Sequence, residues 1–146
     1  MLAIIYTFET TILLIPWGIG GVALLTGFIL LRWSIDRIYK ILPFVFAIVA
    51  LGIGAPSMHQ DMIEITSDSF YLRTGFWWSP TEHQFAFKDA QTVDVIVIPD
   101  LKGRQKDHLH VKLKNGTFAI IPMGTLFRLN QGDILKAVAD AMTSAD

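Results

Sequence analysis

Two histidines separated by one residue are the pair in this sequence best spaced for metal chemistry. His108 and His110 lie in the alternating segment 108–114, HLHVKLK. Side chains two apart on a strand point to the same face, so both imidazoles could hold one metal ion. Asp107 or His83 could then complete the ligand set.

Positive charge on that same face argues against a metal ion. Lys112 and Lys114 continue the alternation beyond the histidines, and their ammonium groups would repel a cation. The histidines are therefore interpreted as residues of a solvent-facing strand surface, and we expect no metal. His59 and Asp61 follow an apolar segment, where a histidine more often anchors a helix end than catalyses.

Patterns typical of catalysis are missing from the rest of the chain. We find no Ser-His-Asp order and no glycine-rich phosphate loop followed by lysine. No carboxylate pair at an evident pocket suggests acid–base catalysis. The absence of cysteine excludes thiol nucleophiles, thiolate metal sites and disulfides. We therefore expect a non-enzymatic protein without catalytic residues or a cofactor.

Three consecutive aromatic residues, Phe76, Trp77 and Trp78, form the main candidate contact surface. Neighbours on a strand point to opposite faces, so at least one ring must be exposed. The rings could rest at a membrane rim, where aromatic side chains are enriched. They could instead contact a protein partner. In a third interpretation one indole fills the interior and the linker covers the other.

A small basic cluster, Lys102, Arg104 and Lys106, lies in the polar loop 100–107. Cations close to a bilayer attract acidic headgroups, so these residues are candidate headgroup contacts. The alternative is an ordinary solvated loop. After residue 56 the chain holds nine Lys or Arg and eleven Asp or Glu. That near-neutral balance argues against a nucleic-acid partner.

The elements that would position these residues begin with two apolar runs. Hydrophobic residues make up 52% of the chain and charged ones 17%, against about 25% charged in average proteins. The run 11–31 has no charge and ends at Arg32 and Trp33, as a transmembrane helix of about 20 residues does. A cleaved signal peptide fits less well, because no basic residue precedes the run and no cleavage site follows it.

The second run predicts another transmembrane helix, over residues 39–58, after a short connection. Gly52, Gly54 and Pro56 are expected to loosen and end this helix. Four glycines of the first helix are spaced for close packing against the second; these are Gly18, Gly20, Gly21 and Gly27. Residues 1–58 are thus predicted to form a transmembrane hairpin, with the lipid bilayer as partner.

Charges in the connection predict the orientation of the hairpin. The loop carries Arg32, Arg37 and Lys40 against one Asp36. Cytoplasmic loops are enriched in such cations, which places residues 59–146 on the extracytoplasmic side of a bacterial inner membrane.

Residues 59–146 alternate as strands and predict a mostly β domain. Strands are expected at 61–66, 70–74, 82–88, 92–98, 108–114 and 117–121, and a short seventh at 123–129. Asn115-Gly116 predicts a hairpin with both residues at positive φ. A C-terminal helix is expected over 133–143, with Asp133 as its N-cap.

This element order resembles that of bacterial pleckstrin-homology-like domains in small membrane proteins with two N-terminal helices. The resemblance is carried by ITSDSFYLRTGFWW (65–78), VDVIVI (93–98), the Asn115-Gly116 hairpin and the closing helix. It implies a membrane-anchored α+β protein with a half-open antiparallel β-barrel closed by that helix. The family often places this domain in the cytoplasm, which conflicts with the orientation expected from the loop charges.

The resemblance implies an assembly or protein-interaction module without shared catalytic activity. We therefore expect a membrane-anchored module that binds a protein partner or a second copy of itself. A lipid-headgroup sensor and an immunity-type membrane protein that blocks a toxin are the alternatives. The phosphoinositide-binding type carries basic residues around its first hairpin, whereas here that turn is Ser67-Asp68-Ser69.

Overall fold

The computed structural model describes residues 3–99 and 103–145. Contacts within the chain divide it into two compact units. The helical unit comprises Phe8–Asp61 and Thr74–Thr81. The β/α unit comprises the described residues up to 7, from 62 to 73 and from 82 onward. The prediction of two domains that meet between residues 58 and 59 stays a prediction.

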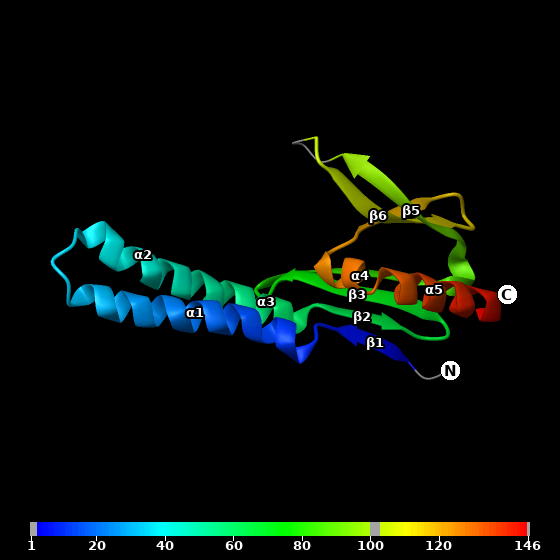
Figure 1. Ribbon diagram of the computed structural model, residues 1–146. Helices are drawn as coiled ribbons and strands as arrows, with labels where there is room; N and C mark the ends of the chain where they lie inside the picture. Colours follow the sequence, from blue (N-terminus) through cyan, green and yellow to red (C-terminus); the bar gives the residue numbers. More distant parts are fainter. Residues whose placement is uncertain (1–2, 100–102, 146) are drawn as a thin grey trace. The chain divides into compact units, whose positions relative to one another are not determined.

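Two long helices make up most of the helical unit (Figure 1). Helix α1 spans Thr10–Leu31. The second helical stretch joins α2 (Arg37–Ile48), the π-helical segment η1 (Val49–Gly54) and α3 (Ala55–Gln60). It therefore continues without a break over 24 residues, Arg37–Gln60. This confirms the predicted helical hairpin.

The expectation that Gly52, Gly54 and Pro56 end the second helix is wrong. The chain winds through wider π-type turns over Val49–Gly54 and then resumes α-helical geometry, with Pro56 in the first turn of α3. Proline fits the start of a helix because its missing N–H is not needed there. The glycine–proline sequence therefore loosens the helix and does not stop it.

Two of the four glycines bring the helices together. A Cβ atom on Gly20 would collide with the side chain of Leu51, and one on Gly27 would lie 2.8 Å from the Phe44 ring. Gly18 and Gly21 have nothing within 4 Å of such an atom. The predicted close packing is thus confirmed for Gly20 and Gly27 only.

The β/α unit contains two antiparallel sheets. The first has the order β1-β2-β3-β4, built from β1 (Ile4–Thr7), β2 (Met62–Ile65), β3 (Ser69–Phe76) and β4 (Ser79–Ala86). The tip of the β3–β4 hairpin, residues 74–81, belongs to the helical unit. A 3-10 turn, η2 (Phe87–Asp89), leads to the second sheet.

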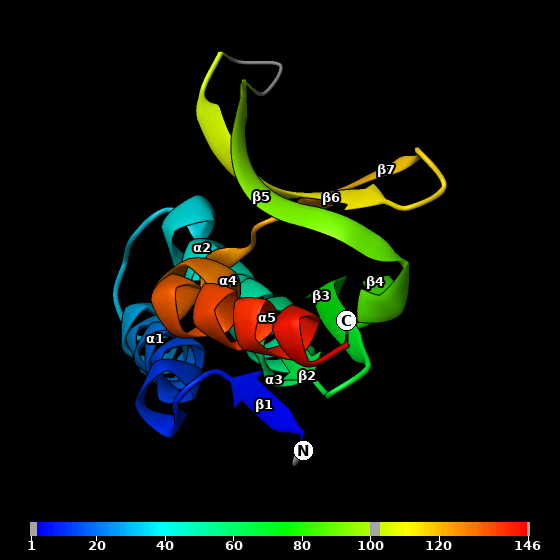
Figure 2. The ribbon, with the colours of Figure 1, turned by 90° about the vertical axis from the view of Figure 1, so that its right-hand side faces the viewer.

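The second sheet has the order β5-β6-β7, from β5 (Ala90–Pro99), β6 (Gln105–Leu113) and β7 (Phe118–Pro122). Figure 2 shows β5 and β6 as a long curved hairpin with β7 alongside β6. The seven antiparallel strands and the C-terminal helix agree with the predicted α+β class. The two sheets form no closed barrel in the described parts of the chain, and the finer pleckstrin-homology-like assignment stays a prediction.

Strand β1 was not predicted from the sequence. It precedes the helical hairpin, yet it pairs with β2, which follows the hairpin, in the register Ile4↔Ile65 to Thr7↔Met62. The two long helices are therefore inserted in the sequence between two neighbouring strands of one sheet. This pairing supports the hairpin and opposes the signal-peptide interpretation, since cleavage after α1 would remove a strand of the sheet.

The predicted seventh strand, 123–129, is wrong. Thr125–Leu129 forms the short helix α4, in which the adjacent residues Leu126 and Phe127 are both buried. A strand would point such neighbours to opposite faces, whereas a helical turn can bury both. The predicted number of strands holds only because β1 takes the place of this segment.

Two local predictions at the ends of elements also need correction. Helix α5 spans Gln131–Ala145, so Asp133 lies in its first turn and is not the N-cap. A carboxylate there still favours the positive end of the helix dipole. In the β6–β7 turn only Gly116 has positive φ, at 84°. Asn115 instead accepts hydrogen bonds from the Thr117 N–H and hydroxyl through Oδ1, at 2.9 and 2.7 Å.

The core of the β/α unit lies between the sheets and the C-terminal helices. Helix α5 packs against β2 and η2 (Figure 2). Its apolar face and its neighbours are almost fully buried; the largest members are Ile63, Phe70, Phe87, Leu109, Val111, Phe127 and Ile134. The predicted amphipathic closing helix is thus confirmed.

Candidate functional site: the aromatic turn

Phe76, Trp77 and Trp78 form the tip of the β3–β4 hairpin, and we call these three residues the aromatic turn. Trp77 and Trp78 connect the end of β3 to the start of β4. Gly75, with φ of 105°, precedes the turn in a conformation that only glycine adopts easily. The reversal therefore needs a residue without a side chain just before the bulky rings.

The three rings form one cluster and are all half-exposed. Their exposed fractions are 53% for Phe76, 51% for Trp77 and 52% for Trp78. Phe76 stacks on Trp78 with centroids 4.9 Å apart, and Trp77 meets Trp78 edge-on at 5.5 Å. Neither indole is buried, so the interpretation in which one of them fills the interior is wrong. The membrane-rim and partner interpretations remain.

Hydrogen bonds tie the aromatic turn to the second helix. The Trp77 indole N–H donates to the Gly52 carbonyl at 2.9 Å. The Trp77 backbone N–H donates to the Ser57 hydroxyl at 3.4 Å, and the Gln60 amide donates to the Gly75 carbonyl at 3.2 Å. These contacts all lie inside the helical unit, so the turn is held as an extension of the helical hairpin.

The bond to Gly52 has a reason in the local sequence. Gly52 lies in the π-helical segment η1, and Pro56, four residues further on, has no N–H with which to form an α-helical bond to the Gly52 carbonyl. Helices in a bilayer tolerate proline when another group satisfies the freed carbonyl. The indole of Trp77 supplies that donor from a distant part of the chain.

Sequence reasoning identified the three aromatic residues but missed their helical partners, Gly52, Ser57 and Gln60. A weak signal was present, because a proline four residues after Gly52 predicts a carbonyl in need of a donor. Nothing in the sequence indicates which of the four tryptophans provides it. That assignment depends on how the β3–β4 tip folds onto the helix.

Asp61, the C-cap of the second helix, directly follows Gln60 of this attachment. Burial raises the pKa of its carboxyl above the usual value, and hydrogen bonds with the Thr74 side chain and the Gly75 backbone lower it to a smaller degree. One of its oxygens, Oδ1, is buried and has no hydrogen-bond partner among the described residues. The carboxyl is therefore held where its charged form is disfavoured.

The candidate headgroup cluster lies elsewhere, in the β/α unit. Lys102 lies outside the described residues, whereas Arg104 and Lys106 are exposed near the start of β6. The structure does not test headgroup contact by these residues, which stays a prediction.

The two histidines of β6 lie on the outer face of the second sheet. The His108 ring nitrogen Nδ1 lies 2.9 Å from the Lys106 carbonyl, and the His110 ring stacks on Phe118 at 4.9 Å. No group of three or more metal-ligating side chains occurs within the part of the chain that the structure describes. The expectation of no metal remains a prediction.

Phe118 and Ile120 are an apolar feature that sequence reasoning did not single out. They lie on the outer face of β7, opposite Lys112 and His110 of β6 in the pairing register, and are 59% and 49% exposed. Their spacing of two residues in 117–121 already placed them on one face. The burial of Ile121 shows that this face points away from the core.

Both long helices are apolar yet exposed. Only 17% of the apolar stretch of Thr10–Leu31 and 11% of that of Arg37–Gln60 is buried within the chain. The core helix of a soluble protein would be mostly buried, whereas a helix apolar on all sides without a protein cover suits lipid. By length, composition and exposure, the hairpin is consistent with membrane association.

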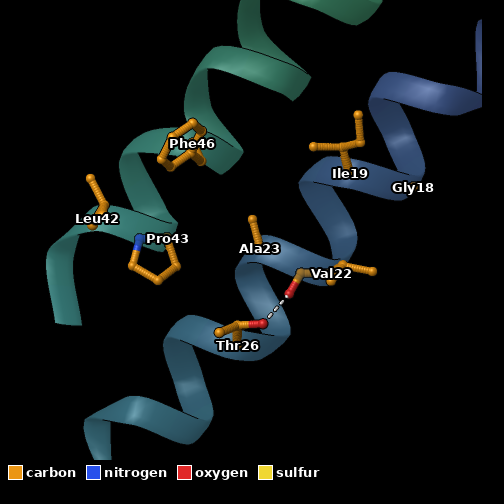
Figure 3. Close-up of a pocket in the computed structure, with 8 residues that line it drawn as sticks. All are labelled: Gly18, Ile19, Val22, Ala23, Thr26, Leu42, Pro43 and Phe46. Atoms are coloured by element: carbon orange, nitrogen blue, oxygen red, sulfur yellow. Dashed lines mark hydrogen bonds between the residues drawn. The ribbon is translucent and has the colours of Figure 1, made fainter. Parts of the chain in front are cut away.

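A groove of about 560 Å³ runs between the two helices (Figure 3). Its walls are Gly18, Ile19, Val22, Ala23, Thr26, Leu42, Pro43 and Phe46. The single hydroxyl, on Thr26, donates to the Val22 carbonyl at 2.8 Å. The groove thus offers an apolar surface of the kind that lipid chains cover.

Comparison of the chain with models of known protein families, with curated proteins and with solved structures gives no match.

Proposed function

We propose that this chain is a membrane-anchored, non-enzymatic interaction module of a bacterial inner membrane. The helical hairpin spans the bilayer, the aromatic turn rests at its rim, and the β/α unit binds a protein partner. The observation that carries partner binding is the exposed apolar pair Phe118 and Ile120 on the outer face of the second sheet.

The low burial of both long apolar helices supports the membrane anchor. A position of the aromatic turn at the membrane rim is supported by its bonds to the end of the second helix. The Trp77 N–H donates to the Ser57 hydroxyl, and the Gln60 amide donates to the Gly75 carbonyl; both helical residues lie in α3, the last part of that helix. Aromatic rings are enriched at the two ends of membrane-spanning helices, close to the boundary between hydrocarbon and headgroups.

The partner surface is supported by the chemistry of the outer sheet face. Phe118 and Ile120 are exposed on a strand whose other face carries the buried Ile121, and the His110 ring stacks on Phe118. Aromatic residues in an apolar patch with a polar surround are typical of interaction hot spots. Lys112 and the histidines supply that polar surround.

Site-specific photo-crosslinking in intact cells tests the partner surface. A photoreactive phenylalanine analogue replaces Phe118 in one variant and Leu129 in another. Leu129 is 56% exposed and belongs to α4, which is not part of the second sheet, so it is a matched control. We expect a discrete crosslinked product at position 118 and not at 129.

An Ile120→Ser substitution should weaken the product formed at position 118, because it removes the neighbouring apolar contact without changing the core. If positions 118 and 129 crosslink equally, or if neither does, the proposed partner surface is wrong. A product at twice the mass of the chain would identify a second copy as the partner.

The loop charges support an extracytoplasmic β/α unit, because Arg32, Arg37 and Lys40 favour a cytoplasmic connection. The resemblance to pleckstrin-homology-like domains favours the opposite side. Pairing of β1 with β2 requires only that both ends of the hairpin lie on one side. Accessibility labelling decides between the two orientations.

A second candidate function, lipid sensing, is favoured by the half-exposure of all three rings of the aromatic turn. In that case binding of the lipid surface by the turn would regulate the protein. Replacing Trp78 by alanine should then change the response to lipid composition, whereas the crosslink at Phe118 should be unchanged.

A further inference from the structure

A second pocket lies at the opposite end of the hairpin from the aromatic turn, at the C-terminal end of α1. It has a volume of about 450 Å³ and is lined by Leu25, Phe28, Ile29, Arg32 and Trp33. The walls change character along the helix. Three apolar side chains form the inner part, and a guanidinium group and an indole form the outer end.

This order matches the order of groups in a phospholipid. Leu25 lies in α1, and Arg32, seven residues further on, is the C-cap of the same helix, about 10 Å along the helix axis. The apolar walls would face acyl chains, while Arg32 would lie where the hydrocarbon ends. Trp33, 62% exposed, provides an indole at the same level, which is the position that tryptophan favours in membrane proteins.

The charge at the outer end has no counterpart within the described chain. Arg32, Arg37 and Lys40 form no ion pair there, and the ion pair that the structure shows joins Arg73 to Glu82 in the other unit. Asp36 is the one carboxylate of the connection, and it is exposed. The Arg32 guanidinium therefore keeps its hydrogen-bond donors available for an anion, and this group matches a phosphate in geometry.

We infer that this pocket binds an anionic phospholipid, with the phosphate held by Arg32 and one acyl chain lying along Leu25, Phe28 and Ile29. The apolar walls select a lipid over a free phosphate, and the unpaired cations select an anionic lipid over a zwitterionic one. The inference rests on the hairpin spanning the bilayer, which is part of the proposed function.

Binding of lipids to the full-length protein in detergent tests the inference, with native mass spectrometry as the readout. The probes are phosphatidylglycerol and phosphatidylcholine with identical acyl chains. Arg32→Gln is the test variant. Arg37→Gln is the matched control, because it removes the same charge from the same connection but does not line the pocket.

We expect wild type to prefer phosphatidylglycerol. Arg32→Gln should reduce that preference about tenfold or more, because it removes charge-assisted hydrogen bonds to the phosphate. Arg37→Gln should reduce it by at most roughly fivefold, through the loss of one surface cation. Arg32→Lys should fall between wild type and Arg32→Gln, because it keeps the charge and loses the planar donor pair.

Equal effects of Arg32→Gln and Arg37→Gln would overturn the inference in favour of diffuse charge attraction. No preference in wild type would overturn it as well. Displacement of the lipid by inorganic phosphate would show a simple anion site without a role for the apolar walls, which also contradicts it. Extraction of the protein from membranes by alkaline carbonate would refute the membrane anchor. Resistance to carbonate without a lipid preference would refute only the lipid pocket, so the two failures can be told apart.

Discussion

The hydrogen bond between the Trp77 indole and the Gly52 carbonyl yields a quantitative prediction. Trp77→Phe removes the donor and keeps an aromatic ring at the position. Trp78→Phe is the matched control, because the two side chains have nearly equal exposure, 51% and 52%, and so lose similar buried area. The difference between the variants isolates the bond, which measures 2.9 Å in wild type.

The expected difference in the free energy of unfolding is about 1 kcal/mol. Interhelical hydrogen bonds in membrane proteins contribute roughly 0.6–1.7 kcal/mol, and a polar group left without a partner costs about 1–3 kcal/mol. The estimate lies towards the lower end of these values because the turn is half-exposed and water can reach part of it. Trp77→Phe should therefore be less stable than Trp78→Phe by this amount.

Reversible unfolding in bicelles measures both variants, and a second background makes the test specific. Pro56→Ala restores a backbone N–H four residues after Gly52, which gives that carbonyl an α-helical donor once η1 takes up α-helical geometry. In that background the penalty of Trp77→Phe should shrink, whereas that of Trp78→Phe should stay the same. Equal penalties for the two variants in the wild-type background would refute the assignment of Trp77 as the donor that Pro56 makes necessary.

Three further predictions concern packing, titration and orientation. Gly27→Ala should be less stable than Gly21→Ala by about 1–3 kcal/mol in the same unfolding assay. The Cβ at position 27 would meet the Phe44 ring at 2.8 Å, whereas the one at position 21 has nothing within 4 Å. Equal stabilities of the two variants would contradict the packing of the hairpin. Burial raises the pKa of Asp61 above its usual 3.8, so the stability this group contributes is present below that pH and is lost as the pH rises through the folded-state pKa. Asp61→Asn should abolish this decline of the free energy of unfolding in a series measured from about pH 4 to about pH 7. An unchanged decline would assign it to another titratable group. Cysteine at the exposed position Ala139 should react with an impermeant maleimide in intact cells if the loop charges set the orientation, and only after lysis if the family pattern does.

Much of the fold follows from local patterns that need no tertiary information. The uncharged run after Thr10 and the second one before Asp61 predict two long helices because each is apolar on all sides. Alternation predicts most strands of the two sheets, and Ile134 and Val138 at helical spacing predict the closing helix. These elements were found because their signals repeat over many residues.

The errors occur where a short segment depends on distant neighbours. Strand β1 has four residues and forms because β2 is available after the hairpin. Residues 123–129 resemble a strand by composition, but the burial of both Leu126 and Phe127 favours a helical turn. In such segments local preference amounts to less free energy than a few tertiary contacts provide.

The sequence by itself determined that the chain has two long apolar helices, an antiparallel β region and an amphipathic helix at its end. It also identified Phe76, Trp77 and Trp78 as candidates for contact, and Arg32 as the residue that ends the first apolar run. Only the tertiary structure decided that Trp77 bonds to Gly52 and that Phe118 and Ile120 remain uncovered. The physical reason is that periodicity reports the environment of each residue along its own element, whereas hydrogen-bond partners and exposed patches depend on which elements come together in space.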